Sequence, residues 1–282
     1  MIGPRVDTSL PRSEAVWARP LGRGGTCATP DRLDRAALTI ALVMHSVNGL
    51  AFRSWSHRRP NSTVYVLVHG IGMSHRYLSR LQAELATRAE VHVVDLPGFG
   101  GLPKPTASPD VAAMARALGT VVDELGVGRA ILVGHSMGAQ WVVELAVQRP
   151  DLASAVVTIG PVTDDRRRGA LRQALLLARD SALEPPRGNA LVLTDYVRCG
   201  PIWYVRQARH MLRYPIEDRV ALLTVPLLVM RGAADPIAQE EWVRRLAARA
   251  PAGSVSVIPG HRHLVQHTAA AAVAERIRAI GP

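Results

Sequence analysis

The residues Gly134, Ser136 and Gly138 form a Gly-x-Ser-x-Gly pattern that follows a short apolar run and precedes a helical pattern. Between a strand and a helix, this spacing places the serine on a tight, strained turn that exposes its hydroxyl group. Side chains at positions 134 and 138 would collide across such a turn, so glycine is expected at both. Met137 begins the helix, and its backbone N–H is available to stabilise an oxyanion. The pattern therefore predicts Ser136 as a nucleophile.

A serine hydroxyl is a poor nucleophile unless a base takes its proton and a third group orients that base. Asp235 follows the apolar run 226–230, and His263 follows the apolar run 254–258. Both are expected at the edge of the sheet that carries Ser136, in the chain order serine, acid, histidine. We predict a catalytic set of Ser136, Asp235 and His263.

Other residues compete for the roles of base and acid. His261 lies two residues before the predicted base and is the alternative, whereas His267 would lie one turn into the next helix. Asp164 and Asp165 lie beyond an earlier strand at the same sheet edge and are rival acids. Asp235 is also well placed to cap the helix that follows it. The remaining histidines are expected at the surface or in polar parts of the core: His45, His57, His75, His92 and His210.

An oxyanion needs a second backbone donor besides Met137. The apolar run 64–68 ends in His-Gly-Ile-Gly, and the glycines allow the chain to turn an N–H toward the nucleophile. We predict Ile71 as that donor, with Gly72 as the next choice. His69 is expected to brace this loop rather than to react.

Apolar runs alternate with helical patterns along most of the chain. This alternation is typical of a mostly parallel central sheet with helices on both faces, so we predict an α/β fold. Strands are expected at 47–55, 64–68, 91–94, 130–133, 155–159, 226–230 and 254–258, and helices at 77–88, 109–125, 137–148, 240–250 and 264–280.

Residues 161–223 break the alternation, because they carry helical patterns and no strand pattern. We predict a helical lid here, inserted into a core formed by residues 36–160 and 224–282. The helical patterns of the lid lie at 169–182, 190–199 and 202–212. Residues 36–48 are expected to form a short helix or to pair loosely with the first strand. Residues 1–35 are rich in Pro, Gly and Arg and are predicted to be a disordered N-terminal extension.

The net charge of +11 would by itself suggest a nucleic acid or an anionic membrane as partner. However, Lys104 is the single lysine, and the arginines are scattered, with the densest run at 166–168. A nucleic-acid partner is therefore not expected. Cys27 and Cys199 lie far apart, which predicts neither a disulfide framework nor a metal site and favours a cytoplasmic location. The apolar stretch 36–43 is far shorter than the roughly 20 residues of a membrane span.

The region from about 47 to 280 resembles an α/β-hydrolase. Five motifs carry the resemblance: His69-Gly70, Asp95-Leu96-Pro97-Gly98-Phe99-Gly100, Gly134-His135-Ser136-Met137-Gly138, Gly232-Ala233-Ala234-Asp235 and Pro259-Gly260-His261-Arg262-His263. In that family the acid follows the strand after the lid and the histidine follows the last strand, which implies Asp235 and His263. The family commonly has glycine directly before the histidine. Arg262 holds that place here, which keeps His261 open as the base.

Family members that open epoxides or displace halide use aspartate at the position of Ser136, so the resemblance implies acyl chemistry instead. We predict hydrolysis of a carboxylic ester through an acyl-enzyme, without cofactor or metal. The lid is rich in apolar residues and suggests a small to medium, largely apolar substrate. Gly72, Trp203 and Tyr204 are candidate pocket residues. Lid arginines are candidates to hold a substrate carboxylate: Arg166, Arg198, Arg206 and Arg209.

Two further hypotheses about function stay open. The same triad serves thioester hydrolysis, acyl transfer, cofactor-free perhydrolysis or hydrolysis of a carbon–carbon bond. A binding scaffold with an idle triad is the reading from a different class of protein. A homodimer is compatible with the sequence.

Overall fold

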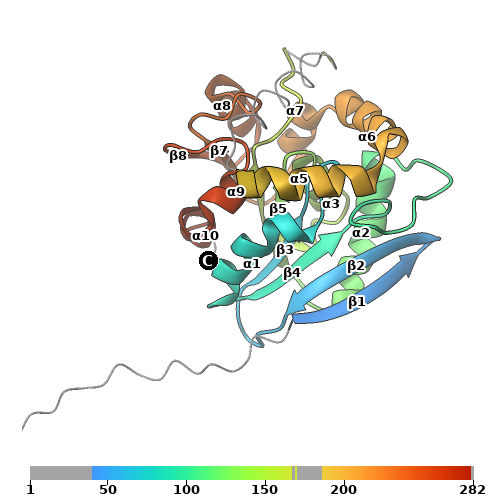
Figure 1. The fold of residues 1–282 in the computed structure, drawn as a ribbon. Coiled ribbons are helices and arrows are strands. Elements are labelled where there is room, and N and C mark those ends of the chain that lie inside the picture. The colour runs from blue at the N-terminus through green and yellow to red at the C-terminus, as the bar shows by residue number, and fades with distance from the viewer. Residues whose placement is uncertain (1–39, 167–168, 170–185, 281–282) are drawn as a thin grey trace, which may run out of the picture. The chain divides into compact units, whose positions relative to one another are not determined.

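The computed structural model describes residues 40–166, 169 and 186–280, and its strands form one eight-stranded sheet (Figure 1). The order is β1-β2-β4-β3-β5-β6-β7-β8. The β1–β2 and β2–β4 pairs are antiparallel and the other pairs are parallel, which confirms the predicted mostly parallel α/β sheet. The strands are β1 (Ile40–Val47), β2 (Leu50–His57), β3 (Val64–Val68), β4 (Glu90–Asp95), β5 (Ala130–His135), β6 (Ala153–Ile159), β7 (Leu227–Gly232) and β8 (Gly253–Ile258).

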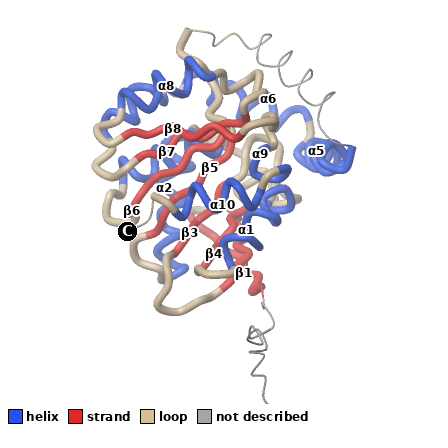
Figure 2. The backbone as a smooth tube through the Cα atoms, turned by 90° about the vertical axis from the view of Figure 1, so that its left-hand side faces the viewer, coloured by secondary structure: helices blue, strands red, loops and turns tan. Residues whose placement is uncertain are grey.

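Helices cover both faces of the sheet (Figure 2). Because side chains alternate along a strand, Val66 and Val68 of β3 belong to the apolar cluster that includes α2, α3 and α8, whereas Tyr65 and Leu67 belong to the cluster that includes α1 and α10. The helices of the core are the 3₁₀ turn η1 (His75–Leu78), α1 (Ser79–Ala86), α2 (Val111–Leu125), α3 (Gly138–Gln148), α8 (Glu240–Arg249), α9 (Val265–Thr268) and α10 (Ala270–Arg278).

The N-terminal part of the sheet follows one of the two predicted alternatives. Residues 40–47 form strand β1, which pairs with β2 as the second alternative expected, and no helix forms there. The expected strand 47–55 is β2, displaced to 50–57. Asn48 and Gly49 join the two strands with φ of 50° and 78°. Two consecutive residues in the left-handed region are the mark of a tight hairpin turn, for which Asn-Gly is the preferred pair. Residues 1–35 lie outside the described residues.

Between β6 and β7 the described residues form helices. These are α5 (Pro186–Cys199), α6 (Pro201–Arg213), α7 (Ile216–Arg219) and the 3₁₀ turn η2 (Val220–Leu222). The helix expected at 169–182 lies outside the described residues. We refer to residues 190–213 as the α5–α6 segment. Nowhere in the described ranges is there a helix with both the length and the apolar character needed to cross a bilayer.

Candidate active site

Ser136 lies on a strained turn directly after β5. Its φ is 57°, in the left-handed region that non-glycine residues adopt only when the surroundings enforce it. Two hydrogen bonds hold the turn: Ser136 N donates to the Ile159 carbonyl at 2.9 Å, and Ala139 N donates to the Ser136 carbonyl at 3.1 Å. The geometry is that of a nucleophile elbow, which stores strain in order to present the side chain.

The glycines on either side of Ser136 are required by close backbone contacts. A Cβ at position 134 would lie 2.3 Å from the Gly138 carbonyl oxygen, which is the collision across the turn that the sequence predicts. A Cβ at position 138 would lie 2.4 Å from the Val68 carbonyl oxygen of β3. The second glycine therefore also lets α3 start directly against the neighbouring strand.

His263 and Asp235 form a buried hydrogen-bonded pair. His263 Nδ1 lies 2.9 Å from Asp235 Oδ2, and the other carboxylate oxygen accepts from the backbone N–H groups of Ile237 and Ala238 at 2.8 and 3.1 Å. Burial alone would raise the pKa of Asp235, but the His263 charge and these hydrogen bonds outweigh it and lower that pKa. The carboxylate thus stays ionised while it orients the imidazole and caps the following turn.

The competing residues have other partners. His261 Nδ1 lies 3.0 Å from the Thr268 hydroxyl, and the His261 carbonyl accepts from Ala234 N at 2.9 Å. Asp164 and Asp165 both accept from Arg245, at 2.6 and 2.8 Å. The structure therefore brings His263, and not His261, to Asp235. Other histidines bind polar side chains: His45 with Glu124 and Ser54, His92 with Glu90 and Ser56, His75 with Asp95, and His210 with Ser108.

Gly160, directly after β6, is a site residue that the sequence reasoning missed. A Cβ there would lie 3.0 Å from His263 Nδ1 and 3.3 Å from Asp235 Oδ2. The residue also has φ of 58°. Any side chain would press on the histidine–aspartate pair, so glycine is needed both for the turn and for the close approach. A glycine ending an apolar run was the available signal.

His135, next to the serine, connects the base to the loop at 69–72, which we call the oxyanion loop. His135 Nε2 lies 2.9 Å from the His263 carbonyl oxygen, and Nδ1 lies 2.9 Å from the Tyr77 hydroxyl. Burial lowers the pKa of His135 to about 3, so the ring is neutral. Since the carbonyl only accepts, Nε2 donates, and Nδ1 accepts from Tyr77. The Tyr77 hydroxyl in turn accepts from Gly70 N at 2.5 Å.

The oxyanion loop is close to the nucleophile and is braced by His69. A Cβ on Gly70 would lie 2.9 Å from the Cβ of Ser136. His69 Nδ1 donates to the Gly70 carbonyl at 2.7 Å and its Nε2 accepts from Leu96 N at 3.0 Å. Burial lowers the pKa of His69, in keeping with this neutral form. Among the hydrogen bonds of the described residues, none uses the backbone N–H of Ile71 or Met137, so both remain available for an oxyanion.

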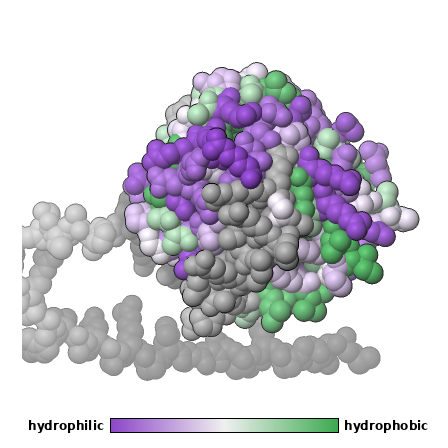
Figure 3. All heavy atoms as spheres, turned by 90° about the horizontal axis from the view of Figure 1, so that it is seen from above, coloured by the Kyte–Doolittle hydropathy of each residue, from purple (hydrophilic) through white to green (hydrophobic). Residues whose placement is uncertain are grey.

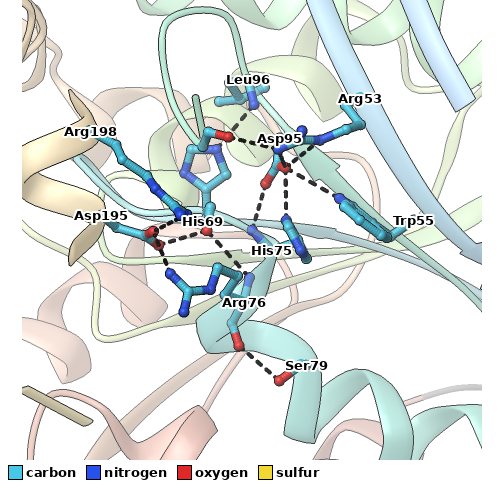
Figure 4. Close-up of polar contacts among 12 residues, drawn as sticks. Arg53, Trp55, His69, His75, Arg76, Ser79, Asp95, Leu96, Asp195 and Arg198 are labelled. Atoms are coloured by element: carbon cyan, nitrogen blue, oxygen red, sulfur yellow. Dashed lines mark hydrogen bonds and ion pairs between the residues drawn. The ribbon is translucent and has the colours of Figure 1, made fainter. Parts of the chain in front are cut away.

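A second buried aspartate lies behind the oxyanion loop (Figure 4). Asp95 accepts from His75 through both the backbone N, at 2.5 Å, and Nδ1, at 2.8 Å. Arg53 donates to the same carboxylate at 2.7 Å, and the Trp55 indole donates at 3.3 Å. Burial opposes ionisation, but the hydrogen bonds from His75 and Arg53 outweigh it, and the pKa of Asp95 falls to about 2. This cluster fixes the start of η1 against β4.

The inner face of the α5–α6 segment contacts the loops around the site. A Cβ on Gly72 would lie 2.4 Å from the Tyr196 ring and 3.3 Å from the Tyr204 ring. A Cβ on Gly98 would lie 2.4 Å from the Trp203 indole. Of the predicted pocket residues, Gly72 and Tyr204 therefore lie together at the oxyanion loop, whereas Trp203 packs on the loop after β4. Ser74 at the same loop donates to the buried carboxylate of Asp195 at 2.6 Å.

The described part of the chain contains no group of three histidine, cysteine or carboxylate side chains placed to hold a metal ion. The structure brings to the site a strained serine, an imidazole oriented by a carboxylate, and backbone N–H groups that no described residue uses.

Comparison with known proteins identifies the family. The model of the Alpha/beta hydrolase family matches residues 65–276. This range covers more than half of the chain and contains Ser136, Asp235 and His263. The chain therefore belongs to the α/β-hydrolase family, as the motifs predict.

Individual relatives are more distant. An uncharacterized protein of Mycobacterium tuberculosis is 35% identical over 102 residues, which cover 36% of this chain and 30% of that protein. The dihydrolipoyllysine-residue acetyltransferase component of the acetoin cleaving system of Pseudomonas putida is 28% identical over 254 residues, covering 83% of this chain and 67% of that protein. A thermophilic esterase from Thermogutta terrifontis superimposes with a TM-score of 0.72 at 21% identity, covering 85% of this chain and 97% of that one.

Proposed function

We propose that this chain is a serine hydrolase that cleaves a carboxylic ester through an acyl-enzyme. Ser136 Oγ attacks the ester carbonyl carbon while its proton passes to His263 Nε2. The C–O bond to the alcohol then breaks, and His263 gives the proton to the departing oxygen. Water attacks the acyl-enzyme in the second half, with His263 again taking a proton, and the carboxylic acid leaves.

The observation that carries the proposal is the buried His263–Asp235 pair beside a strained serine. Asp235 holds the Nδ1–H of the imidazole, which leaves Nε2 as the nitrogen that can accept a proton. The ionised carboxylate also stabilises the positive charge that develops on the ring. The N–H groups of Ile71 and Met137 are the proposed oxyanion donors.

Three observations favour an ester as the substrate. The serine nucleophile favours acyl chemistry, and the esterase neighbour shares the fold. Tyr196 and Tyr204 cover the oxyanion loop and favour a small to medium, largely apolar substrate. We also propose that residues 161–223 act as a lid and that the protein works in the cytoplasm. The acetyltransferase relative keeps acyl transfer as the second candidate, beside thioester hydrolysis, perhydrolysis and carbon–carbon bond hydrolysis.

A fluorophosphonate probe tests the nucleophile. The probe should label the wild-type chain and leave Ser136→Ala unlabelled, with Ser74→Ala as a matched control that keeps labelling. Absence of labelling in the folded wild type would reject the enzyme and favour the scaffold. A panel of p-nitrophenyl esters, acyl-CoA thioesters and diketones then separates the candidate reactions, and the ester proposal requires the highest kcat/KM with the esters.

A further inference from the structure

The outer face of the α5–α6 segment carries exposed aliphatic side chains. Leu193 and Val197 of α5 are 66% and 74% exposed, and Ile202 and Val205 of α6 are 71% and 48% exposed. Each pair is spaced by about one helical turn, so its members share one face. Single exposed aliphatics are ordinary, but two such pairs on consecutive helices indicate a surface with a partner. The opposite face of α6 is buried through Trp203, Gln207 and Met211.

The same segment carries positive charge without exposed negative charge. Arg206, Arg209 and Arg213 of α6 are exposed, and none forms an ion pair with a described residue. The single acidic residue between 190 and 213 is Asp195, and it is buried. Helix α8 shows the contrast: its arginines all pair with carboxylates, Arg244 with Glu240, Arg245 with Asp164, and Arg249 with Asp218. The arginines of α6 are therefore unneutralised cations beside aliphatic side chains.

A pocket of about 240 Å³ opens at the start of α6. Two of its lining side chains, Lys104 and Arg206, are cations without an ion-pair partner in the described residues, and Ile202 and Trp203 supply apolar walls. No carboxylate lines it. In the view from above in Figure 3, strongly hydrophilic and hydrophobic residues lie side by side on the right, the side on which Figure 1 draws α6. The chemistry suits a phosphate group at the end of an apolar molecule.

We propose that the outer face of the α5–α6 segment docks on an anionic lipid surface, with a lipid phosphate in the pocket between Lys104 and Arg206. Exposed aliphatics beside unneutralised arginines are the composition of helices that lie in a membrane interface, where the aliphatics enter the headgroup boundary and the cations meet anionic lipids. A nucleic acid would use the arginines but leave the aliphatics in water.

Docking in this way has a consequence for the proposed reaction. The inner face of the same helices contacts the oxyanion loop through Tyr196 and the loop after β4 through Trp203. The lipid surface would thus lie close to the proposed active site and favour substrates with a lipid-derived acyl chain. This last step rests on the proposed function, whereas the docking itself does not.

Vesicle co-sedimentation with the Ser136→Ala chain tests docking independently of catalysis. We expect binding to vesicles of phosphatidylcholine with phosphatidylglycerol, little binding to phosphatidylcholine alone, and weaker binding at high salt. One juxtamembrane charge contributes about five-fold in binding, so Arg206→Glu with Arg209→Glu should weaken it by more than about ten-fold. Val197→Asp with Ile202→Asp should do the same. Lys104→Glu tests the pocket and should also weaken binding.

The matched controls are Arg88→Glu, in the loop before β4 at the opposite edge of the sheet, and Leu222→Asp on η2. Both residues are exposed and both variants should bind as the parent chain does. Loss of binding in the controls equal to that in the α6 variants would overturn the proposal, as would a failure of the parent chain to bind anionic vesicles. A complex with an acidic protein that the α6 variants lose, without any vesicle binding, would assign the face to a protein partner instead. The same surface substitutions are also made in the chain that keeps Ser136, and their fluorophosphonate labelling is measured. Labelling without vesicle binding would contradict docking alone, whereas vesicle binding without labelling would contradict the proposed function alone.

Discussion

The part of the chain that the structure describes contains two aspartate–histidine pairs with a buried carboxylate, and we propose that one of them, Asp235–His263, serves catalysis. His263 lies 2.9 Å from Asp235, and His75 lies 2.8 Å from Asp95. Both carboxylates end or follow a parallel strand, and both accept backbone N–H groups. In both, hydrogen bonds and the neighbouring histidine outweigh burial and lower the pKa. The distance between acid and imidazole therefore does not distinguish the two pairs.

The difference lies in the cations around each carboxylate. Arg53 donates two hydrogen bonds to Asp95, so that charge is already neutralised, and His75 stacks on Trp55 with ring centroids 4.0 Å apart. Arg231, in contrast, donates to the backbone carbonyl of Asp235. The negative charge of Asp235 is thus left for the charge that develops on His263. We therefore expect the Asp235–His263 pair, whose carboxylate has no arginine bound to it, to be the one that acts in catalysis.

The largest expected effect is the loss of the catalytic imidazole. His263→Ala should lower kcat by about 10⁶-fold, by analogy with removal of the histidine from a serine protease triad. His75→Ala should keep most of the activity, because its pair holds a loop and not a proton-transfer group. Steady-state ester hydrolysis measures both. His261→Ala is the closest control, and if it lost activity while His263→Ala did not, the assignment of the base would be wrong.

The two aspartates should separate activity from stability. Asp235→Asn should lower kcat by about 10⁴-fold, because an amide favours the wrong tautomer of the imidazole. The fold should remain, since the backbone N–H groups of Ile237 and Ala238 can still bind the amide oxygen. Asp164→Asn, at the rival acid, should keep activity. Equal losses in Asp235→Asn and Asp164→Asn would contradict the pairing with His263.

The Asp95–His75 pair should contribute to the pH dependence of the free energy of unfolding in acid. The pKa of Asp95 falls from its usual 3.8 to about 2 on folding, which corresponds to about 2 kcal/mol of unfolding free energy. Because the folded pKa is the lower one, this stability is present above pH 4 and is lost as the pH falls toward 2. Asp95→Asn should remove that part of the acid dependence and lower stability at pH 7, as followed by circular dichroism in urea. An unchanged profile would show that the Arg53 and His75 contacts add nothing to folding.

The sequence was sufficient for the residues whose role depends on local backbone geometry. Gly134 and Gly138 are required by backbone contacts within the turn itself and with the neighbouring strand β3. The presence of glycine at both positions is therefore enough to predict the turn. Asp235 and His263 follow apolar runs, and parallel strands bring such positions to one edge. The Asn48-Gly49 hairpin carried a local signal too, and the apolar run before it, 40–44, lies in strand β1.

The choice between His261 and His263 needed the three-dimensional structure. A Cβ on Gly232 would lie 2.3 Å from the carbonyl oxygens of His261 and Arg262, so the backbone of the base loop packs directly on the end of β7. This contact joins residues about 30 positions apart and positions the loop that carries both histidines. It cannot be predicted from the spacing of residues in the sequence. The links from Tyr77 to His135 and from His75 to Asp95 were missed for the same reason, since each joins segments that are far apart in the sequence.

The smallest predicted effect concerns how the catalytic base is held. His75 is fixed by the carboxylate that it binds, whereas the backbone of His263 is held by His135, which Tyr77 orients. Tyr77→Phe removes the hydrogen-bond partner of both Gly70 N and His135 Nδ1. One lost hydrogen bond corresponds to about ten-fold, so we expect kcat to fall by at least about ten-fold, with KM little changed.

Tyr65→Phe is the matched control for Tyr77→Phe. Tyr65, a residue of β3, is equally buried, and it belongs to the apolar cluster that includes α1 and α10. The two variants should lose similar melting temperature. A purely structural Tyr77 would lower kcat no more than Tyr65→Phe does. A fall in kcat in Tyr77→Phe but not in Tyr65→Phe, together with slower fluorophosphonate labelling of Ser136, would show that the Tyr77 hydroxyl positions the oxyanion loop and His263. His263 would then differ from His75, which Asp95 holds without such a link.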